Sequence, residues 1–255
     1  MALTITTVGQ DMKHETAFER DIWGEAVHNP PSGLIPARRV IEGQTVTLEP
    51  LDPAIHGAAL YRASHGSEAA LDIWTYLPWG PWENEAGFMA HMASNAANFE
   101  YIWYAFRLKD SDEISGMACY LDVQPAQGVI EIGGIWFAPE MQRTRAATEA
   151  LFLMLDYTMT DLRYRRMQWR CNALNQKSRN AALRLGFKYE GIFYNHMIFK
   201  GRNRDTAWYS ILDSDWPEVR KTITAWLRND NFDGGGMAQS SLSGNMSRRL
   251  VPKRS

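Results

Sequence analysis

Several features that would assign this chain to a familiar class are scarce or missing. Only two cysteines, Cys119 and Cys171, occur among 255 residues, and no Cys-x-x-Cys or closely spaced Cys/His pattern is present. Disulfide frameworks and zinc sites need such spacing. We therefore expect two buried free thiols, because an unpaired cysteine behaves as a small apolar side chain, and we assign no metal.

Long apolar runs and an excess of one charge are also missing. No segment approaches the roughly 18 apolar residues of a membrane-spanning helix, and the acidic N-terminal stretch lacks the apolar core of a secretory signal. With 27 basic and 29 acidic side chains the net charge is −2, which favours neither nucleic acid nor an anionic membrane as a partner. We expect a soluble, cytoplasmic protein that acts on a small molecule or a peptide.

The hydropathy pattern divides the chain into four parts. Residues 1–44 show no sustained period and are expected to lie as an arm over the domain. Residues 45–213 form the predicted domain, residues 214–229 contain a predicted helix at 216–227, and the Gly/Ser-rich residues 230–255 are expected to be disordered because they contain few apolar side chains. The arm and the helix at 216–227 are candidates for contact with a second copy, which would make a homodimer.

Within the predicted domain, two-residue and 3.6-residue periods alternate. Strands are predicted at residues 45–51, 102–108, 114–122, 129–137, 166–172, 188–200 and 205–212. Helices are predicted at residues 54–64, 83–98, 144–162 and 177–185. Gly186 follows the last of these helices, where a left-handed residue commonly ends a helix.

The junction after the strand at 129–137 has the features of an anion site. The strand stops at Pro139, and a helix opens near Thr144. The first amides of a helix have no partner within it, and its dipole is positive at that end. Such a junction suits a pyrophosphate.

Three segments in this region together resemble the GNAT N-acetyltransferases, specifically their RimJ/RimL-like branch. They are QRTRAATEA from Gln142, the sequence NQKS from Asn175, and LRLGF ending at Phe187. Each is weak alone, but they occur in the order and spacing of the family. The resemblance covers residues 45–212 and implies an α+β fold: a mixed, mostly antiparallel sheet of about seven strands, flanked by helices, with acyl-CoA bound at the splayed central strands.

The resemblance also implies how acetyl-CoA would be held. The pantetheine arm would pair with the strand before the loop, and the loop amides would take the pyrophosphate, which gives as binding residues Ile135, Trp136, Phe137, Gln142, Arg143, Thr144, Arg145, Ala146, Ala147, Asn175 and Ser178. Arg145 stands where the family usually has its first glycine. Its amide can donate if its φ stays negative, and its guanidinium is a candidate for a bond to phosphate.

Two residues are candidates for catalysis. Glu131 is the only acidic side chain on its strand, and a carboxylate in an apolar surrounding has a raised pKa and can remove an ammonium proton. The alternative is a polar position on an exposed strand face. The family often uses a tyrosine acid where this chain has Ala182, so Ser178 is the candidate for protonating the thiolate. The alternative for Ser178, as for Asn175, is a helix cap.

Aromatic side chains are candidates for the acceptor pocket, because they provide apolar walls with polar tips. The binding candidates are Tyr76, Trp79, Tyr120 and Tyr194, and the alternative is that most of them belong to the core. The predicted activity is acetyl transfer from acetyl-CoA to a primary amine, either a protein N-terminus or a small amine or amino acid. A non-catalytic acyl-CoA-binding module is the alternative, and nucleic-acid binding through the arginines near residue 165 is the least favoured.

Overall fold

The computed structural model describes residues 26–249, and the chain divides into a short unit, Met1–Pro30, and a large unit, Pro31–Ser255. The described part of the short unit, residues 26–30, contains no helix or strand. All the elements below belong to the large unit. None of the helices in the described part of the chain has both the length and the apolar character needed to cross a bilayer.

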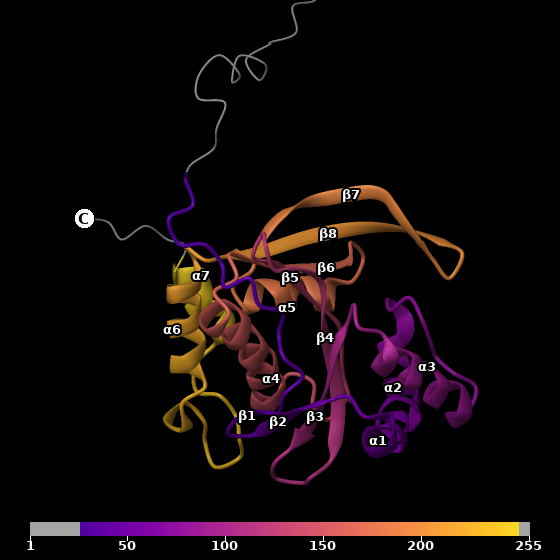
Figure 1. The fold of residues 1–255 in the computed structure, drawn as a ribbon. Coiled ribbons are helices and arrows are strands. Elements are labelled where there is room, and N and C mark those ends of the chain that lie inside the picture. The colour runs from indigo at the N-terminus through magenta and orange to yellow at the C-terminus, as the bar shows by residue number, and fades with distance from the viewer. Residues whose placement is uncertain (1–25, 250–255) are drawn as a thin grey trace, which may run out of the picture. The chain divides into compact units, whose positions relative to one another are not determined.

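One sheet of eight strands organises the large unit (Figure 1). Its spatial order is β1 (Ile41–Glu42), β2 (Val46–Pro50), β3 (Ile102–Leu108), β4 (Ile114–Gln124), β5 (Val129–Phe137), β6 (Arg166–Asn172), β8 (Arg202–Leu212) and β7 (Lys188–Phe199). All neighbours are antiparallel except β5 and β6. The predicted mixed sheet is confirmed, with the short β1 as an additional strand.

The two parallel strands part after three residues. Val129–Glu131 of β5 pairs with residues 166–168 of β6, and beyond that point the strands continue without pairing to each other. Gly134 lies in the separated part of β5 with φ 59, and a Cβ there would lie 2.4 Å from Trp103 Cη2. Only glycine fits a position with both this backbone and this close ring contact. The sheet is thus splayed at its centre, as the resemblance implied.

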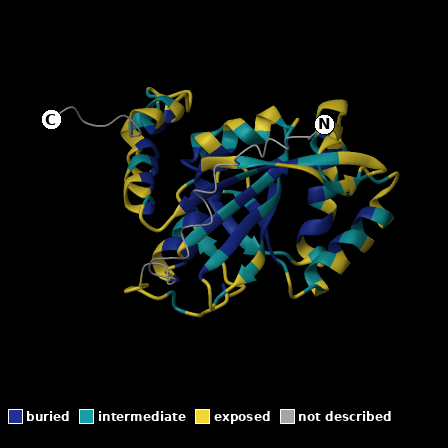
Figure 2. Cartoon of the chain, turned by 90° about the horizontal axis from the view of Figure 1, so that it is seen from above, coloured by how far each residue is buried: buried dark blue, intermediate teal, exposed yellow. Residues whose placement is uncertain are grey.

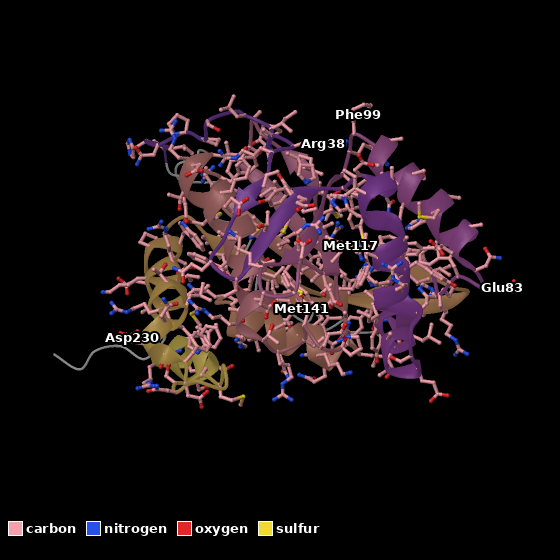
Figure 3. All side chains as sticks on the ribbon, turned by 90° about the horizontal axis from the view of Figure 1, so that it is seen from below. Arg38, Glu83, Phe99, Met117, Met141 and Asp230 are labelled. Carbon is pink, nitrogen blue, oxygen red and sulfur yellow. The ribbon has the colours of Figure 1, made fainter. Side chains whose placement is uncertain are left out.

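Helices cover the two faces of the sheet. One face carries α1 (Pro53–His65), α2 (Glu68–Leu71), η3 (Asp72–Thr75) and α3 (Glu85–Ala97), and the other carries α4 (Arg145–Asp156), which continues as a π turn, η4 (Tyr157–Asp161), together with α5 (Gln176–Arg184). Figure 1 shows these groups on opposite sides, and we call the two sides the α1–α3 face and the α4 face. Each face has its own apolar core; Met117 and Met141, labelled in Figure 3, belong to the first and the second.

The predicted stripe on α4 is confirmed, because Ala147, Leu151, Met154 and Leu155 are all buried. Figure 2 shows the same concentration of burial in the central strands and the inner helix faces. Gly186 ends α5 with φ 93, and a Cβ there would lie 2.9 Å from Val219 Cγ2, so its left-handed conformation and the close packing of α6 (Trp216–Trp226) both require glycine. The short helices α2 and η3 were missed because they are too short for a period to show.

The expectation of a disordered tail from residue 230 is wrong for the described residues 230–249. They contain η5 (Asn229–Asn231) and α7 (Leu242–Arg249), in which Leu242 and Met246 are only 2% exposed. Trp226 Nε1 donates to the Ser240 carbonyl at 2.9 Å, and α7 packs on α5 and α6. Two apolar side chains one turn apart make a narrow stripe that a nearby core can bury. Residues 250–255 lie outside the described part.

The boundary expected between arm and domain at residue 44 is also displaced. Residues 41–42 form β1, and the carbonyls of Leu34 and Ala37 accept hydrogen bonds from the hydroxyls of Tyr164 (2.8 Å) and Tyr104 (2.9 Å). Residues 31–40 therefore pack against the domain as extended chain. Residues 1–25 of the predicted arm lie outside the described residues.

Candidate functional site

The start of α4 presents backbone donors to the junction after β5. Thr144 is the N-cap: its side chain accepts from the Ala147 amide at 3.2 Å and donates to the Met141 carbonyl at 2.7 Å. The amides of Arg143, Arg145 and Ala146 donate no hydrogen bond to any residue from 26 to 249. Three unpaired amides and the positive helix end meet at one junction, which is an arrangement suited to an anion.

Arg145 differs from the expectation in one respect. It begins α4 with helical backbone, so its amide keeps the negative φ that donation requires, and the strained position is Arg143 at φ 65. The Arg145 side chain, however, is engaged elsewhere. Its Nη2 donates to Gln44 Oε1 (2.7 Å), the Leu227 carbonyl (2.5 Å) and Asn229 Oδ1 (2.8 Å). These contacts use only Nη2, so a bond from this guanidinium to phosphate stays a prediction.

The Arg145 guanidinium joins the helix start to the C-terminal segment. Its Cζ lies 4.7 Å from the centroid of the Phe232 ring. A shallow hollow of about 380 Å³ lies beside it, lined by Gln44, Arg228, Asn229 and Asp230; Figure 3 labels the last of these on that segment. This hollow is not at the splay of the sheet and holds none of the predicted site residues.

The strand residues predicted for the pantetheine arm lie in the separated part of β5. Trp136 is buried on the α1–α3 face, whereas Ile135 and Phe137 are partly buried against the core of the α4 face. Gln142 Nε2 donates to the Phe137 carbonyl at 3.1 Å, which ties the loop to the strand end. The parallel neighbour β6 does not pair with this part of β5, so the β5 backbone lies beside the opening.

Asn175 and Ser178 begin α5, and both take part in capping. Asn175 Oδ1 accepts from the Ser178 amide at 3.0 Å, so Asn175 is the N-cap. The Ser178 hydroxyl accepts from Trp169 Nε1 at 3.0 Å. Burial raises the pKa of the Cys171 thiol, and the adjacent Ser178 hydroxyl partly offsets that rise. The helix cap that was the alternative role is thus present for the Asn175 side chain, whereas the Ser178 hydroxyl bonds to Trp169 and lies beside the Cys171 thiol.

Glu131 is buried rather than exposed. It is 3% exposed, and because Ile130 and Ile132 point into the core of the α4 face, strand alternation places Glu131 on the α1–α3 face. Burial raises the pKa of Glu131 to about 7, although the nearby Arg170 guanidinium lowers it. Arg170 Nε lies against Glu131 Oε2 as an ion pair, yet that oxygen accepts no well-oriented hydrogen bond.

Arg170 was not recognised as a site residue from the sequence. It also pairs with Asp122, and its Cζ lies 5.0 Å from the Trp208 ring centroid. One cation thus serves two carboxylates, which holds Glu131 in place and opposes the effect of burial on its pKa. The sequence signal for this position is the alternation in RMQWRCN. Met167, Trp169 and Cys171 are buried on one face, so Arg170 lies on the opposite face of the sheet.

The four acceptor candidates differ in burial and in the face of the sheet that they occupy. Tyr120 is fully buried on the α4 face, where its hydroxyl donates to the Met154 carbonyl at 2.7 Å, so strand alternation removes it from the Glu131 side. Tyr194 is 75% exposed on β7. Trp79 packs 6.1 Å from the Trp103 ring on the α1–α3 face, and the Tyr76 hydroxyl donates to the Leu174 carbonyl at 3.3 Å.

Both cysteines are free and buried, as predicted. Burial raises the pKa of Cys119 well above its usual value, and the neighbouring Glu131 carboxylate adds to the effect. A thiol held protonated is a poor nucleophile. Within residues 26–249, no three His, Cys, Asp or Glu side chains gather closely enough to hold a metal ion.

Comparison with known proteins places the chain in a family. A model of the acetyltransferase (GNAT) domain matches residues 45–188. A GCN5-related N-acetyltransferase from Brucella melitensis is 40% identical, with 86% of this chain and 97% of that chain covered and a TM-score of 0.82. A probable GNAT-family acetyltransferase from Chromobacterium violaceum is also 40% identical, with 76% and 96% covered and a TM-score of 0.70.

A more distant structure is that of RimL, a ribosomal L7/L12 α-N-protein acetyltransferase in complex with coenzyme A. It is 21% identical, with 69% of this chain and 100% of that chain covered and a TM-score of 0.58, and this likeness concerns the fold alone. No curated protein matches the chain. With a family model that covers more than half of its length, the chain belongs to the GNAT family of N-acetyltransferases.

Proposed function

We propose that this protein transfers an acetyl group from acetyl-CoA to a primary amine, with Glu131 as the base. The observation that carries the proposal is a buried carboxylate with a pKa of about 7 on the strand pair that opens at the centre of the sheet. A base with this pKa is about half ionised at neutral pH, and its ionised form accepts a proton readily. Glu131 would take the ammonium proton, directly or through a water molecule, and so free the amine for attack.

The donor would be held by backbone. The free amides of Arg143, Arg145 and Ala146 fit a diphosphate, and the separated part of β5 fits an extended arm. Acetyl-CoA supplies an activated acyl group, so the protein needs no nucleophile of its own. Its residues would orient the two reactants and hold protons, which is where most of the rate gain is expected.

The Ser178 hydroxyl is the proposed proton donor to the departing thiolate. It accepts a hydrogen bond from Trp169 Nε1, so the hydroxyl keeps a proton that it can direct to a sulfur atom, as it does toward the adjacent Cys171. The buried Ala182 cannot serve this purpose. Assignment to the RimJ/RimL-like branch, and with it a protein N-terminus as one class of acceptor, depends on the NQKS and QRTRAATEA motifs.

The test is release of coenzyme A thiol with a panel of amino acids, polyamines, amino sugars and N-terminal peptides. We expect turnover with one class, rising with pH through about 7 as Glu131 loses its proton. Glu131→Gln should lower kcat by about 100-fold or more, remove that rise and leave the acetyl-CoA Kd unchanged in calorimetry.

The matched control is Glu140→Gln, since Glu140 is exposed next to the same loop. It should retain full activity. Tight acetyl-CoA binding without thiol release for any amine would favour the alternative, a non-catalytic acyl-CoA-binding module.

A further inference from the structure

Arg204 is a partly buried cation near the opened end of the sheet. It lies on β8 opposite Met197 of β7, just beyond the last β6–β8 pair at Asn172 and Thr206. Its Nη1 donates only weakly, to Met197 Sδ at 3.4 Å, and its Cζ lies 4.4 Å from the Phe199 ring centroid. The Met197 thioether and the Phe199 ring hold the Arg204 side chain without neutralising its positive charge.

Arg166 and Arg170 of the neighbouring β6 have carboxylate partners, whereas Arg204 has none among the described residues. Arg166 bonds to Glu190 at 2.7 and 2.5 Å, and Arg170 pairs with Asp122 and Glu131. Across residues 26–249, no Asp or Glu oxygen lies within ion-pair distance of Arg204, and its buried Nε donates no hydrogen bond. Burial lowers the pKa of Arg204, and the neighbouring Arg170 charge adds to this effect.

Arg204 and Glu131 face the same side of the sheet. Ala207, Tyr209 and Ile211 of β8 point into the core of the α4 face, so Arg204 and Trp208 point to the α1–α3 face. Arg170 joins the two groups, since it lies against Glu131 and over Trp208. The Arg204 charge acts to lower the pKa of Glu131, and the Glu131 charge acts to raise that of Arg204.

Further unmet hydrogen-bonding atoms lie on this face. The buried Nε1 atoms of Trp103 and Trp208 donate no hydrogen bond within the described chain, and Glu131 Oε2 accepts none. Unpaired buried polar atoms are rare in folded proteins and call for an explanation. Here they comprise donors of three residues and one carboxylate oxygen; an anionic oxygen group would satisfy such a donor, and an ammonium group would satisfy the carboxylate oxygen.

We propose that Arg204 binds a carboxylate of the acceptor, so that the amine acetylated by this protein is an amino acid rather than a polyamine, an amino sugar or an uncharged amine. This inference rests on the proposed function. The acceptor ammonium lies at Glu131, where it can donate to the unmet Oε2 atom. The acceptor carboxylate lies at Arg204, where it neutralises the charge of the guanidinium. A polyamine would place a second cation beside Arg204 and be repelled.

The experiment compares matched acceptors by thiol release: amino acids, their carboxamides, the corresponding amines without a carboxyl group, and polyamines. For the unaltered protein, kcat/KM should be at least about tenfold higher for an amino acid than for its carboxamide. Arg204→Gln should lower kcat/KM by about 10- to 100-fold for the amino acid, mainly through KM, and little for the carboxamide. Its acetyl-CoA Kd should stay unchanged.

Arg202→Gln is the matched control, because Arg202 is exposed two residues earlier on the same strand. Arg204→Lys keeps the charge and should retain part of the preference, and thermal unfolding of all three variants reports on folding. Equal turnover of acids, carboxamides and polyamines, or an equal loss for acid and carboxamide in Arg204→Gln, would overturn the inference and leave the proposed function standing. Absence of thiol release with every amine would overturn the proposed function itself, and this inference with it.

Discussion

At the scale of single residues, the site depends on how one strand position is buried. Glu131 alternates with Ile130 and Ile132, and the α1–α3 face excludes water from it. Without Arg170 the pKa of this carboxylate would be higher still, because the main effect that opposes burial would be absent. At a fully exposed position the pKa would have its ordinary value. The competition between desolvation and one shared cation therefore sets the proton affinity of the proposed base.

This competition predicts a pH dependence of stability. The folded pKa of Glu131 is about 7 against an ordinary 4.5, so folding favours its protonated form. Its contribution is fully present below about pH 4.5 and is lost as the pH rises through 7. The glutamine side chain in Glu131→Gln stays neutral, so this variant does not lose stability in this way. The difference in free energy of unfolding, variant minus unaltered protein, should therefore rise by about 2–3 kcal/mol between about pH 5 and pH 8. Urea unfolding at several pH values measures this, and a difference independent of pH would contradict it.

At the scale of elements, the start of α4 meets two different needs. Its amides face the junction after β5, while the first side chain of the helix reaches the chain beyond α6. Where the family usually has a glycine, Arg145 adds three hydrogen bonds to Gln44, Leu227 and Asn229. The departure from the family motif thus concerns the attachment of the C-terminal segment rather than the backbone of the loop.

Arg145→Ala should therefore loosen residues 227–232. We expect faster amide hydrogen exchange there and a loss of about 1–3 kcal/mol in the free energy of unfolding, because hydrogen bonds from a charged group are lost. Arg143→Ala is the control, since Arg143 is exposed and surface substitutions usually change stability by less than about 0.5 kcal/mol. Equal effects of the two substitutions would show that the Arg145 contacts do not stabilise the segment.

At the scale of the whole chain, the segment after α6 completes the core of the α4 face. Leu242 and Met246 of α7 pack with α5 and α6, and the Arg184 guanidinium lies 4.9 Å from the Trp226 ring centroid. The apolar side of α6 is buried in the same core: Trp216, Val219, Ile223 and Trp226 are each at most 5% exposed. This side is consequently used within the chain and is not free for a second copy.

Removing residues 230–255 should therefore destabilise the protein without abolishing the sheet. Burial of two large apolar side chains contributes roughly 3–6 kcal/mol, so the melting temperature should fall by several degrees. Removal of residues 250–255 alone is the control, because it leaves α7 and its contacts in place. Thermal unfolding followed by circular dichroism measures both, and equal melting temperatures would contradict the packing role of α7.

Much of this protein was determined by local sequence. Two-residue and 3.6-residue periods place seven strands and the main helices, and Thr144 and Gly186 mark a helix start and a helix end through their own side chain or its absence. The family motifs and the free amides before α4 follow from the same short segments. These features depend on neighbours within a few residues, so the sequence alone specifies them.

Tertiary structure decided which side chains meet. The Arg170 contacts with Asp122 and Glu131, the unpaired Arg204, the removal of Tyr120 to the other face and the burial of α7 all join residues far apart in the chain. Which strand lies beside which is set by packing over the whole core, and the dielectric environment of a charge by everything that excludes water from it. For that reason Glu131 is a candidate in the sequence, but its pKa and its partners are properties of the fold.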